Sequence, residues 1–336
     1  MGIGLVGCGR ISKNHFEAIR KIPNTKIVGC CDIIEERARE AANTYDIPYW
    51  TTNYEELLKQ EEIDLISICT PSGLHPEHGI MAANHGKHVL TEKPMGVKLT
   101  DADKLIEACD ENGVRLFVVL QNRLNPSIQM VKKAIDNGRF GKLYMIVANV
   151  FWSRPQAYYD LADWRGTWAL DGGAFCNQAS HYVDLVQWFG GPVTSVMAQT
   201  DTLARKIEAE DTGAAMIKFD SGCIATINVS MLTYPKNFEG SITIIGEKGT
   251  VRVGGIAVNE ILYWKFSDKE IELIVSRPVA HTDSVYGFGH DAYYENVINA
   301  ITKGESPLVD GRAGRKSLAL IEAIYLSNRD QKAVTL

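Results

Sequence analysis

The sequence predicts an α/β protein with an N-terminal doubly wound parallel sheet and a C-terminal α+β domain that contains a large, mostly antiparallel sheet. Its 336 residues exceed what one hydrophobic core usually spans, so two domains are expected. Short apolar runs alternate with amphipathic segments up to residue 119, and long alternating runs joined by glycine turns follow. We place the domains at 1–122 and 123–336, with the C-terminal helix able to pack back on the first domain.

The parallel sheet is predicted from apolar runs at residues 3–6, 27–31, 65–69, 88–90 and 116–119. Between them, apolar residues recur at three- and four-residue spacing over 11–22, 35–45 and 102–109, as in amphipathic helices. Strands that alternate with helices form βαβ units, so we expect five parallel strands.

The antiparallel sheet is predicted from alternating runs at 144–152, 195–200, 213–219, 223–229, 241–245, 250–253 and 260–266. Helices are expected at 128–136, at 173–189 with Asp171 as its N-cap, and at 289–302 and 312–328. Helices on one face of such a sheet leave the other face without a partner, so we expect a homo-oligomer, a dimer or tetramer.

Composition excludes several classes of function. The net charge is −6 and the basic residues are scattered, which argues against a nucleic-acid partner. No apolar run approaches the roughly 20 residues of a membrane span, and no signal peptide precedes the first strand, so we expect a cytoplasmic protein without a membrane partner. The seven cysteines show no CxxC spacing and are expected to be reduced. His75 and His78 have a zinc-like spacing, but Pro76 lies between them and no third ligand follows, so we predict no metal.

A dinucleotide site is predicted where the first strand ends. That strand runs into Gly7-Cys8-Gly9-Arg10-Ile11-Ser12, a G-x-G-x-x-S variant of the Rossmann fingerprint, and a helix pattern follows at once. Asp32 ends the second strand, at the distance where an acidic residue bonds the adenosine ribose. The next residues are Ile33 and Ile34 rather than an arginine for a 2′-phosphate, so NAD is favoured over NADP.

Two further strands end in motifs that carry a family resemblance. The run 65–69 leads into Thr70-Pro71-Ser72-Gly73-Leu74-His75, and the run 88–90 leads into Glu92-Lys93-Pro94. With the later Gly172-Gly173, Asn177 and His181-x-x-Asp184, the sequence resembles the Gfo/Idh/MocA oxidoreductases over nearly its whole length. The resemblance and the strand ends together imply NAD-binding residues Gly7, Gly9, Arg10, Ile11, Asp32, Thr70, Pro71, Leu74, His75, Glu92, Lys93 and Gln121.

Within that family, the stretches 10–16, 150–159, 171–185 and 284–290 are similar to the group that oxidises UDP-N-acetylglucosaminuronate at C3. The resemblance implies an NAD-dependent sugar dehydrogenase of nucleotide-sugar and surface-polysaccharide biosynthesis. Its 3-keto product would pass to an aminotransferase.

Oxidation of a secondary alcohol needs a base within hydrogen-bond reach of the hydroxyl. Lys93 and His181 are the candidates. Lysine has an ordinary pKa of about 10.4, but burial and the positive charge of oxidised nicotinamide would both lower it. Asn177, His181 and Asp184 have a spacing that places them on one helix face, where Asp184 would hold or polarise His181 and Asn177 would bond a sugar hydroxyl. The residues leave the choice of base open.

The stretch 151–168 combines aromatic residues with arginines, including Trp164 and Arg165. Aromatic faces suit a uracil ring, and arginine forks suit a pyrophosphate or a uronate carboxylate. The alternative is an interface or domain-packing loop. The predicted substrate-binding residues are Lys93, Arg123, Trp164, Arg165, Asn177, His181 and Tyr286.

Two other functions stay open. One is a dehydrogenase for inositol or another free sugar or polyol. The other is a non-catalytic regulator that senses NAD or a sugar. Retention of Lys93, His181 and Asp184 argues against the regulator, because a sensor has no need of a proton-transfer set.

Overall fold

The computed structural model describes residues 1–255, 257–268 and 289–336, which form two compact units. The first unit contains residues 1–120 and 290–318, and the second contains 121–289 and 319–336. Relative to the division expected at residue 122, the first unit also includes α9 and the start of α10. Among the described helices, none combines the length and the apolar character of a membrane span.

The first unit is built on a six-stranded parallel sheet with the order β3-β2-β1-β4-β5-β6. This order reverses at β1 and β4, the position where open α/β sheets bind ligands. The Rossmann prediction is confirmed, although the sheet has one strand more than expected, because β3 is too short to show an apolar pattern. The strands are β1 (Gly2–Val6), β2 (Lys26–Cys31), β3 (Tyr49–Thr51), β4 (Leu65–Ile68), β5 (His88–Thr91) and β6 (Leu116–Val118).

Helices join these strands and bury their apolar faces on the sheet. They are α1 (Ser12–Ile19), α2 (Glu35–Tyr45), α3 (Tyr54–Leu58), α4 (His75–Asn84) and α5 (Leu99–Glu111). Two helices from the end of the chain, α9 (Gly289–Lys303) and α10 (Gly311–Asp330), also contribute to this unit. The Tyr293 hydroxyl donates to the carbonyl of Val118 on β6, and Arg315 pairs with Asp103 of α5. These contacts explain why 290–318 belongs to the first unit.

The second unit is built on an eight-stranded sheet with the order β13-β12-β11-β7-β10-β9-β8-β14. Among its described strands, β7 and β10 alone pair in parallel, which confirms the mostly antiparallel sheet. Its strands are β7 (Leu143–Phe151), β8 (Val193–Asp201), β9 (Thr212–Phe219), β10 (Ile224–Ser230), β11 (Glu239–Gly246), β12 (Gly249–Gly254), β13 (Glu260–Phe266) and β14 (Val334–Thr335).

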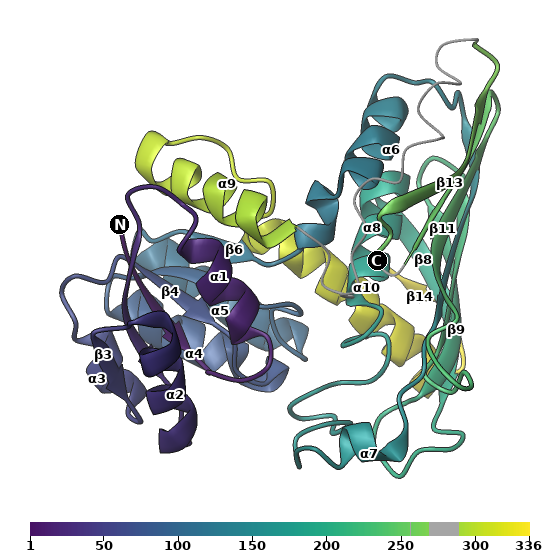
Figure 1. Cartoon of the computed structure of the whole chain (residues 1–336). Helices are drawn as coiled ribbons and strands as arrows, with labels where there is room; N and C mark the ends of the chain where they lie inside the picture. Colours follow the sequence, from purple (N-terminus) through teal and green to yellow (C-terminus); the bar gives the residue numbers. More distant parts are fainter. Residues whose placement is uncertain (256, 269–288) are drawn as a thin grey trace. The chain divides into compact units, whose positions relative to one another are not determined.

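Helices cover one face of this sheet, and no described helix lies on the other (Figure 1). Figure 1 shows α6 (Pro126–Asp136), α8 (Ser180–Gly190) and the second half of α10 on the same side, and the short helix α7 (Gln156–Tyr159) lies in a connection. Side chains alternate along β9 and β10, buried toward the helices and exposed or half-buried on the opposite face. Met197 of β8 and Met216 of β9 form a cross-strand pair on that exposed face.

Candidate active site

The glycine turn after β1 has the geometry of a phosphate cradle. Gly7 has φ of +92°, and a Cβ there would lie 2.7 Å from backbone atoms of Cys69, so only glycine fits. Around Gly9, by contrast, nothing among the described residues lies within 4 Å of the place a Cβ would take. The Ser12 hydroxyl donates to the Gly9 carbonyl at 2.7 Å and closes the turn as α1 begins. The open side of Gly9 is where a pyrophosphate would approach the backbone at the helix N-terminus.

Asp32 lies at the end of β2 beside this turn. Its carboxylate accepts hydrogen bonds of 2.8 Å from the backbone N–H groups of Cys8 and Ile34. The carboxylate is therefore fixed on the glycine turn, as ribose recognition requires. Ile33 is 89% exposed, so the position after Asp32 offers no charge to a phosphate.

His75 and Thr70 organise the motif that follows β4. The ring of His75 contacts the Pro94 carbonyl through Nδ1 at 2.7 Å and the Thr70 carbonyl through Nε2 at 2.8 Å. The Thr70 hydroxyl contacts Nδ1 of His78 at 3.0 Å. Burial lowers the pKa of His75 more than the two carbonyls raise it. Both nitrogens of His75 are thus engaged by the protein, and Pro71 and Leu74 of the same motif lie in or beside the 3-10 turn Ser72–Leu74.

Glu92, expected to address the cofactor, has its carboxylate inside the first unit. Oε1 lies 2.9 Å from Nε2 of His15 on α1 and 3.8 Å from Nε2 of His290 on α9. Oε2 accepts the backbone N–H of Lys93 at 3.0 Å. His15, Glu92 and His290 are all buried, and Lys93 itself is half-buried at the end of β5.

In the second unit, Arg123 and Asp184 form a buried ion pair. The guanidinium donates from Nε and Nη2 to the two carboxylate oxygens at 2.8 and 2.6 Å. The Arg123 guanidinium also lies over the ring of Trp188, 4.8 Å from its centroid. His181 lies one turn before Asp184 on α8 and is buried as well. The helix thus carries both His181 and Asp184, and the Asp184 carboxylate binds Arg123.

The helix expected over 173–189 begins only at Ser180, so this part of the prediction is wrong. The N–H groups of Gly173 and Cys176 donate to the Tyr325 hydroxyl, and that of Phe175 donates to Glu210 at 2.9 Å. These side chains hold the loop in a non-helical conformation, and Gly172 at its start has φ of +70°.

Two further expectations fall in the same loop. Asp171 is not an N-cap, because its carboxylate accepts the N–H of Gly166 and the side-chain amide of Asn177. Asn177 therefore lies in the loop that precedes α8 rather than on the helix.

The Glu210 carboxyl, from the connection between β8 and β9, is buried against the loop that precedes α8. Burial raises its pKa to about 7, although hydrogen bonds from Phe175 and Tyr325 act in the opposite direction. A Cβ on Gly173 would fall inside this carboxyl group, which explains the second glycine of the pair. Glu210 and Tyr325 shape the segment that carries Asn177 and leads to His181.

Arginines and aromatic rings are interleaved in the loop between β7 and α8. The Arg165 guanidinium lies 4.5 Å from the Tyr158 ring centroid and 4.6 Å from that of Trp164, and it donates to the Tyr158 hydroxyl at 2.8 Å. The Arg154 guanidinium lies 5.1 Å from the Trp152 centroid. Among the described residues, neither arginine has a carboxylate within 4.0 Å, so both charges are held by aromatic faces.

The remaining predicted residues are placed as follows. Gln121 is buried in the 3-10 turn Gln121–Leu124 that follows β6 in the chain, Ile11 is half-buried at the start of α1, and Arg10 is exposed. Tyr286 lies outside the described residues.

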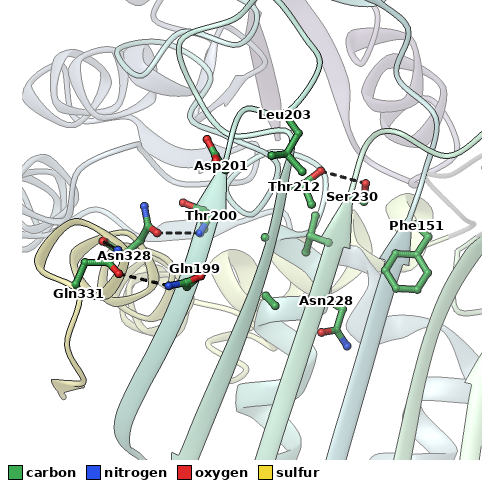
Figure 2. A pocket seen from close by; sticks show the side chains of 13 residues that line it. Phe151, Gln199, Thr200, Asp201, Leu203, Thr212, Asn228, Ser230, Asn328 and Gln331 are labelled. Atoms are coloured by element: carbon green, nitrogen blue, oxygen red, sulfur yellow. Dashed lines mark hydrogen bonds between the residues drawn. The ribbon is translucent and has the colours of Figure 1, made fainter.

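A pocket of about 490 Å³ lies elsewhere in the second unit, beside β8, β9, β10 and the end of α10 (Figure 2). Side chains such as Gln199, Asn228 and Asn328 line it, and Asn328 accepts the N–H of Thr200 at 2.9 Å. The predicted site residues do not line this pocket. We therefore place no chemistry there.

Sequence reasoning gave no role to His15, His290, Glu210 or Tyr325. Each acts through a partner far away in the sequence; the two residues of the pair His15 and Tyr294, for example, are separated by 279 positions. Local periodicity carries no signal for such pairs. The polar character of the three that lie in largely apolar helix patterns, His15, His290 and Tyr325, is the one hint that the sequence offered.

Both parts of the chain match known families. Residues 1–120 match the Gfo/Idh/MocA family described as "Oxidoreductase family, NAD-binding Rossmann fold", and residues 132–336 match "Oxidoreductase family, C-terminal alpha/beta domain". A curated relative, D-apiose dehydrogenase of Paraburkholderia graminis, is 28% identical over 99% of this chain and 88% of its own.

Two solved structures are more similar. The WlbA dehydrogenase from Bordetella pertussis, in complex with NADH and UDP-GlcNAcA, is 51% identical with a TM-score of 0.91 and covers 99% of this chain and 98% of its own. The WlbA dehydrogenase from Chromobacterium violaceum, in complex with the same two molecules, is 48% identical with a TM-score of 0.93, and the match covers 100% and 96% of the two chains.

Proposed function

The chain belongs to the Gfo/Idh/MocA oxidoreductase family and is an NAD-dependent sugar dehydrogenase, and we propose that it oxidises the C3 hydroxyl of UDP-N-acetylglucosaminuronic acid to the 3-keto sugar. The observation that carries this proposal is the identity of about half of all residues to two dehydrogenases solved with NADH and UDP-GlcNAcA. The inositol and free-sugar dehydrogenases among the relatives are much less similar, for example 26% for the myo-inositol 2-dehydrogenase of Thermotoga maritima.

The first unit fits NAD. The open side of Gly9 leaves room for the pyrophosphate at the start of α1, and the fixed carboxylate of Asp32 suits the adenosine ribose. Arg10, Ile11, Thr70, Pro71, Leu74, His75 and Gln121 complete the proposed cofactor set, with Gly7 shaping the turn. NAD⁺, when bound, supplies the hydride acceptor.

The chain itself must take the hydroxyl proton as the C3–H bond breaks with its electron pair. We assign this proton to Lys93, with His181 as the alternative. Lys93 projects from a backbone segment that buried side chains fix on both sides, as a preorganised catalytic group requires. In the second unit, Asp184 holds Arg123 and lies one helical turn after His181 on α8.

The substrate is a dianionic diphosphate that also carries a carboxylate, so arginines without acidic partners are suited to it. Arg165 and Trp164 form one such set, with Arg154 beside them on aromatic faces. Asn177 would bond a sugar hydroxyl from the loop before α8. Arg123 and Tyr286 complete the proposed substrate contacts.

Three further features belong to the proposal. A second copy of the chain would cover the exposed sheet face that carries Met197 and Met216, giving a homo-oligomer. The reactive 3-keto product would be consumed by an aminotransferase. All seven cysteines are free thiols, which suits a reducing cytoplasm.

The decisive experiment incubates the purified protein with NAD⁺ and UDP-N-acetylglucosaminuronate, with and without 2-oxoglutarate, and identifies the products by mass. We expect the sugar to lose two hydrogens. Parallel reactions with myo-inositol test the polyol alternative. Turnover of inositol alone, or no oxidised sugar under any condition, would contradict the substrate assignment.

Lys93→Met separates an enzyme from a sensor. We expect this variant to bind NAD but to lose turnover, whereas Lys59→Met, which changes an exposed lysine of the same unit, should retain activity. Unchanged turnover in Lys93→Met would favour a sensor.

A further inference from the structure

A buried cluster of polar side chains lies directly behind the segment that carries Lys93. It is formed by His15 of α1, Glu92 at the end of β5 and His290 at the start of α9, all within the first unit. These ligand-type atoms lie within 4.8 Å of one another. The proposed roles of the glycine turn and of the sugar-binding candidates give His15 and His290 of this cluster no function.

The cluster is connected to Lys93 by a chain of short contacts. Nε2 of His15 lies 2.9 Å from Oε1 of Glu92, within hydrogen-bond distance, whereas Nε2 of His290 lies 3.8 Å from the same oxygen and only borders it. The other oxygen, Oε2, accepts the Lys93 N–H at 3.0 Å. An ionised carboxylate only accepts hydrogen bonds, so His15 donates from Nε2.

The far side of the His15 ring fixes its orientation. Nδ1 lies 2.7 Å from the Tyr294 hydroxyl and 3.0 Å from the Ser67 hydroxyl, and these hydroxyls lie 2.9 Å apart. A neutral imidazole with its proton on Nε2 accepts at Nδ1, so both hydroxyls can serve as donors in turn. Burial lowers the pKa of His15, which agrees with this neutral form.

The charge state of Glu92 follows from the same contacts. Burial raises its pKa, but the hydrogen bond from His15 and the nearby His290 ring outweigh burial and hold it well below its ordinary value. Other titratable groups near this carboxylate include the Tyr294 hydroxyl and the Cys69 thiol, which stay neutral because burial raises their pKa, and the His75 ring, whose pKa burial lowers. A charged acceptor makes the bond to the Lys93 N–H roughly twice as strong as a neutral one would.

The segment is also held after Lys93. The Pro94 carbonyl contacts Nδ1 of His75 at 2.7 Å. Lys93 therefore lies between two peptide groups that buried side chains from α1, α4 and α9 fix from opposite ends. Small displacements of a reacting group cost catalysis heavily, up to about 100-fold for about 1 Å.

We propose that His15 and His290 are positioning residues that act through Glu92 to fix the backbone from which the Lys93 amine reaches the substrate. The inference rests on the proposed function only in taking Lys93 as the residue that meets the sugar hydroxyl. It assigns a role to Glu92 that is separate from cofactor binding.

The test compares His15→Phe and Glu92→Gln with wild type and with His88→Phe. His88 is a matched control, because it lies at the opposite end of β5 and accepts the Arg115 N–H at 3.0 Å. Two quantities are measured: kcat and KM for both substrates, and residue-resolved hydrogen exchange at the Lys93 amide in the free protein.

We expect His15→Phe to lower kcat about tenfold or more while both KM values change less than about twofold. Hydrogen exchange at the Lys93 amide should accelerate about tenfold, because the Glu92 carboxylate that accepts its hydrogen bond loses the hydrogen bond from His15. Glu92→Gln keeps the shape and weakens the acceptor, so smaller changes in the same direction are expected. His88→Phe should leave kcat and Lys93 exchange unchanged.

Unchanged Lys93 exchange in both variants would overturn the proposal, even if kcat fell. A stoichiometric metal ion in the purified wild type that His15→Phe loses would overturn it in favour of a metal centre. If His15→Phe does not fold, His290→Phe and Glu92→Gln decide the same question. Wild type without sugar turnover would contradict the proposed function alone, since the exchange measurement needs no substrate.

Discussion

Arg123 and Asp184 share two hydrogen bonds, of 2.8 and 2.6 Å, inside the second unit. Arg123 comes from the turn that follows β6 in the chain, and Asp184 from the middle of α8. Both side chains are buried, and the Trp188 ring lies against the guanidinium. The pair thus connects the turn at the start of the second unit to the helix that carries His181.

Arg123→Lys should destabilise the protein although it keeps the charge. A lysine cannot bond both carboxylate oxygens in the fork geometry, so Asp184 would stay buried with part of its hydrogen bonding lost. We expect the free energy of unfolding in urea to fall by about 1–3 kcal/mol. Arg329→Lys is the matched control, because Arg329 makes the same two-bond contact with Asp330 at an exposed site. An equal loss of unfolding free energy in both variants would show that burial does not determine how much the Arg123–Asp184 pair stabilises the protein.

The two glycines of the cofactor turn should respond differently to alanine. Gly9→Ala places a methyl group in open space, so the free energy of unfolding should change by less than about 1 kcal/mol while the Kd for NAD rises about tenfold or more. Gly7→Ala must instead clash with the Cys69 backbone at a positive φ, and should lower stability by about 1–3 kcal/mol. Calorimetric titration and urea unfolding measure the two effects. Normal NAD affinity in Gly9→Ala would show that the pyrophosphate does not bind at this turn.

The proton acceptor can be identified from the pH dependence of kcat. A base must be deprotonated before it can act, so kcat rises with pH on the acidic side of the profile. We expect Lys93→Met to lower kcat by about 100-fold or more and to abolish that rise, and His181→Gln to lower kcat while the rise persists. The reverse pattern would assign the proton to His181.

Local patterns predicted the parts of this protein that depend on neighbours in the sequence. The glycine turn and Asp32 belong to one βαβ unit, and the structure places both at the same sheet edge. Lys93 was singled out because it follows a buried strand, and its role in the reaction stays a prediction. The alternating runs located seven strands of the second sheet, and of its described strands the two-residue β14 alone was not predicted.

What failed depends on contacts between distant residues. The helix expected from residue 173 starts at Ser180 because Glu210 and Tyr325 take backbone N–H groups that a helix would have used. Glu92 stays a predicted cofactor residue, and periodicity gave no sign that its carboxylate also lies 2.9 Å from Nε2 of His15 on α1. Periodicity describes which face of an element is apolar, and it does not tell which polar groups of other elements will compete for that element's hydrogen bonds.

Glu210 makes stability depend on pH in a direction opposite to most carboxyl groups. Burial raises its pKa to about 7 in the folded protein, while in the unfolded chain it titrates near its ordinary value of 4.5. Between these values the folded state binds the extra proton. The contribution of Glu210 to stability is therefore complete below about pH 4.5 and is lost as the pH rises through about 7.

Glu210→Gln should remove this loss, because the amide keeps the acceptor for Phe175 and Tyr325 and cannot ionise. We expect the variant to gain about 1–3 kcal/mol over wild type at pH 8 and to differ little at pH 5, as measured by urea unfolding at both pH values. Glu208→Gln, an exposed carboxyl of the same loop, is the control and should show no such divergence. A gain of equal size at both pH values would mean that the substitution acts through packing, and that the buried carboxyl is ionised throughout this range.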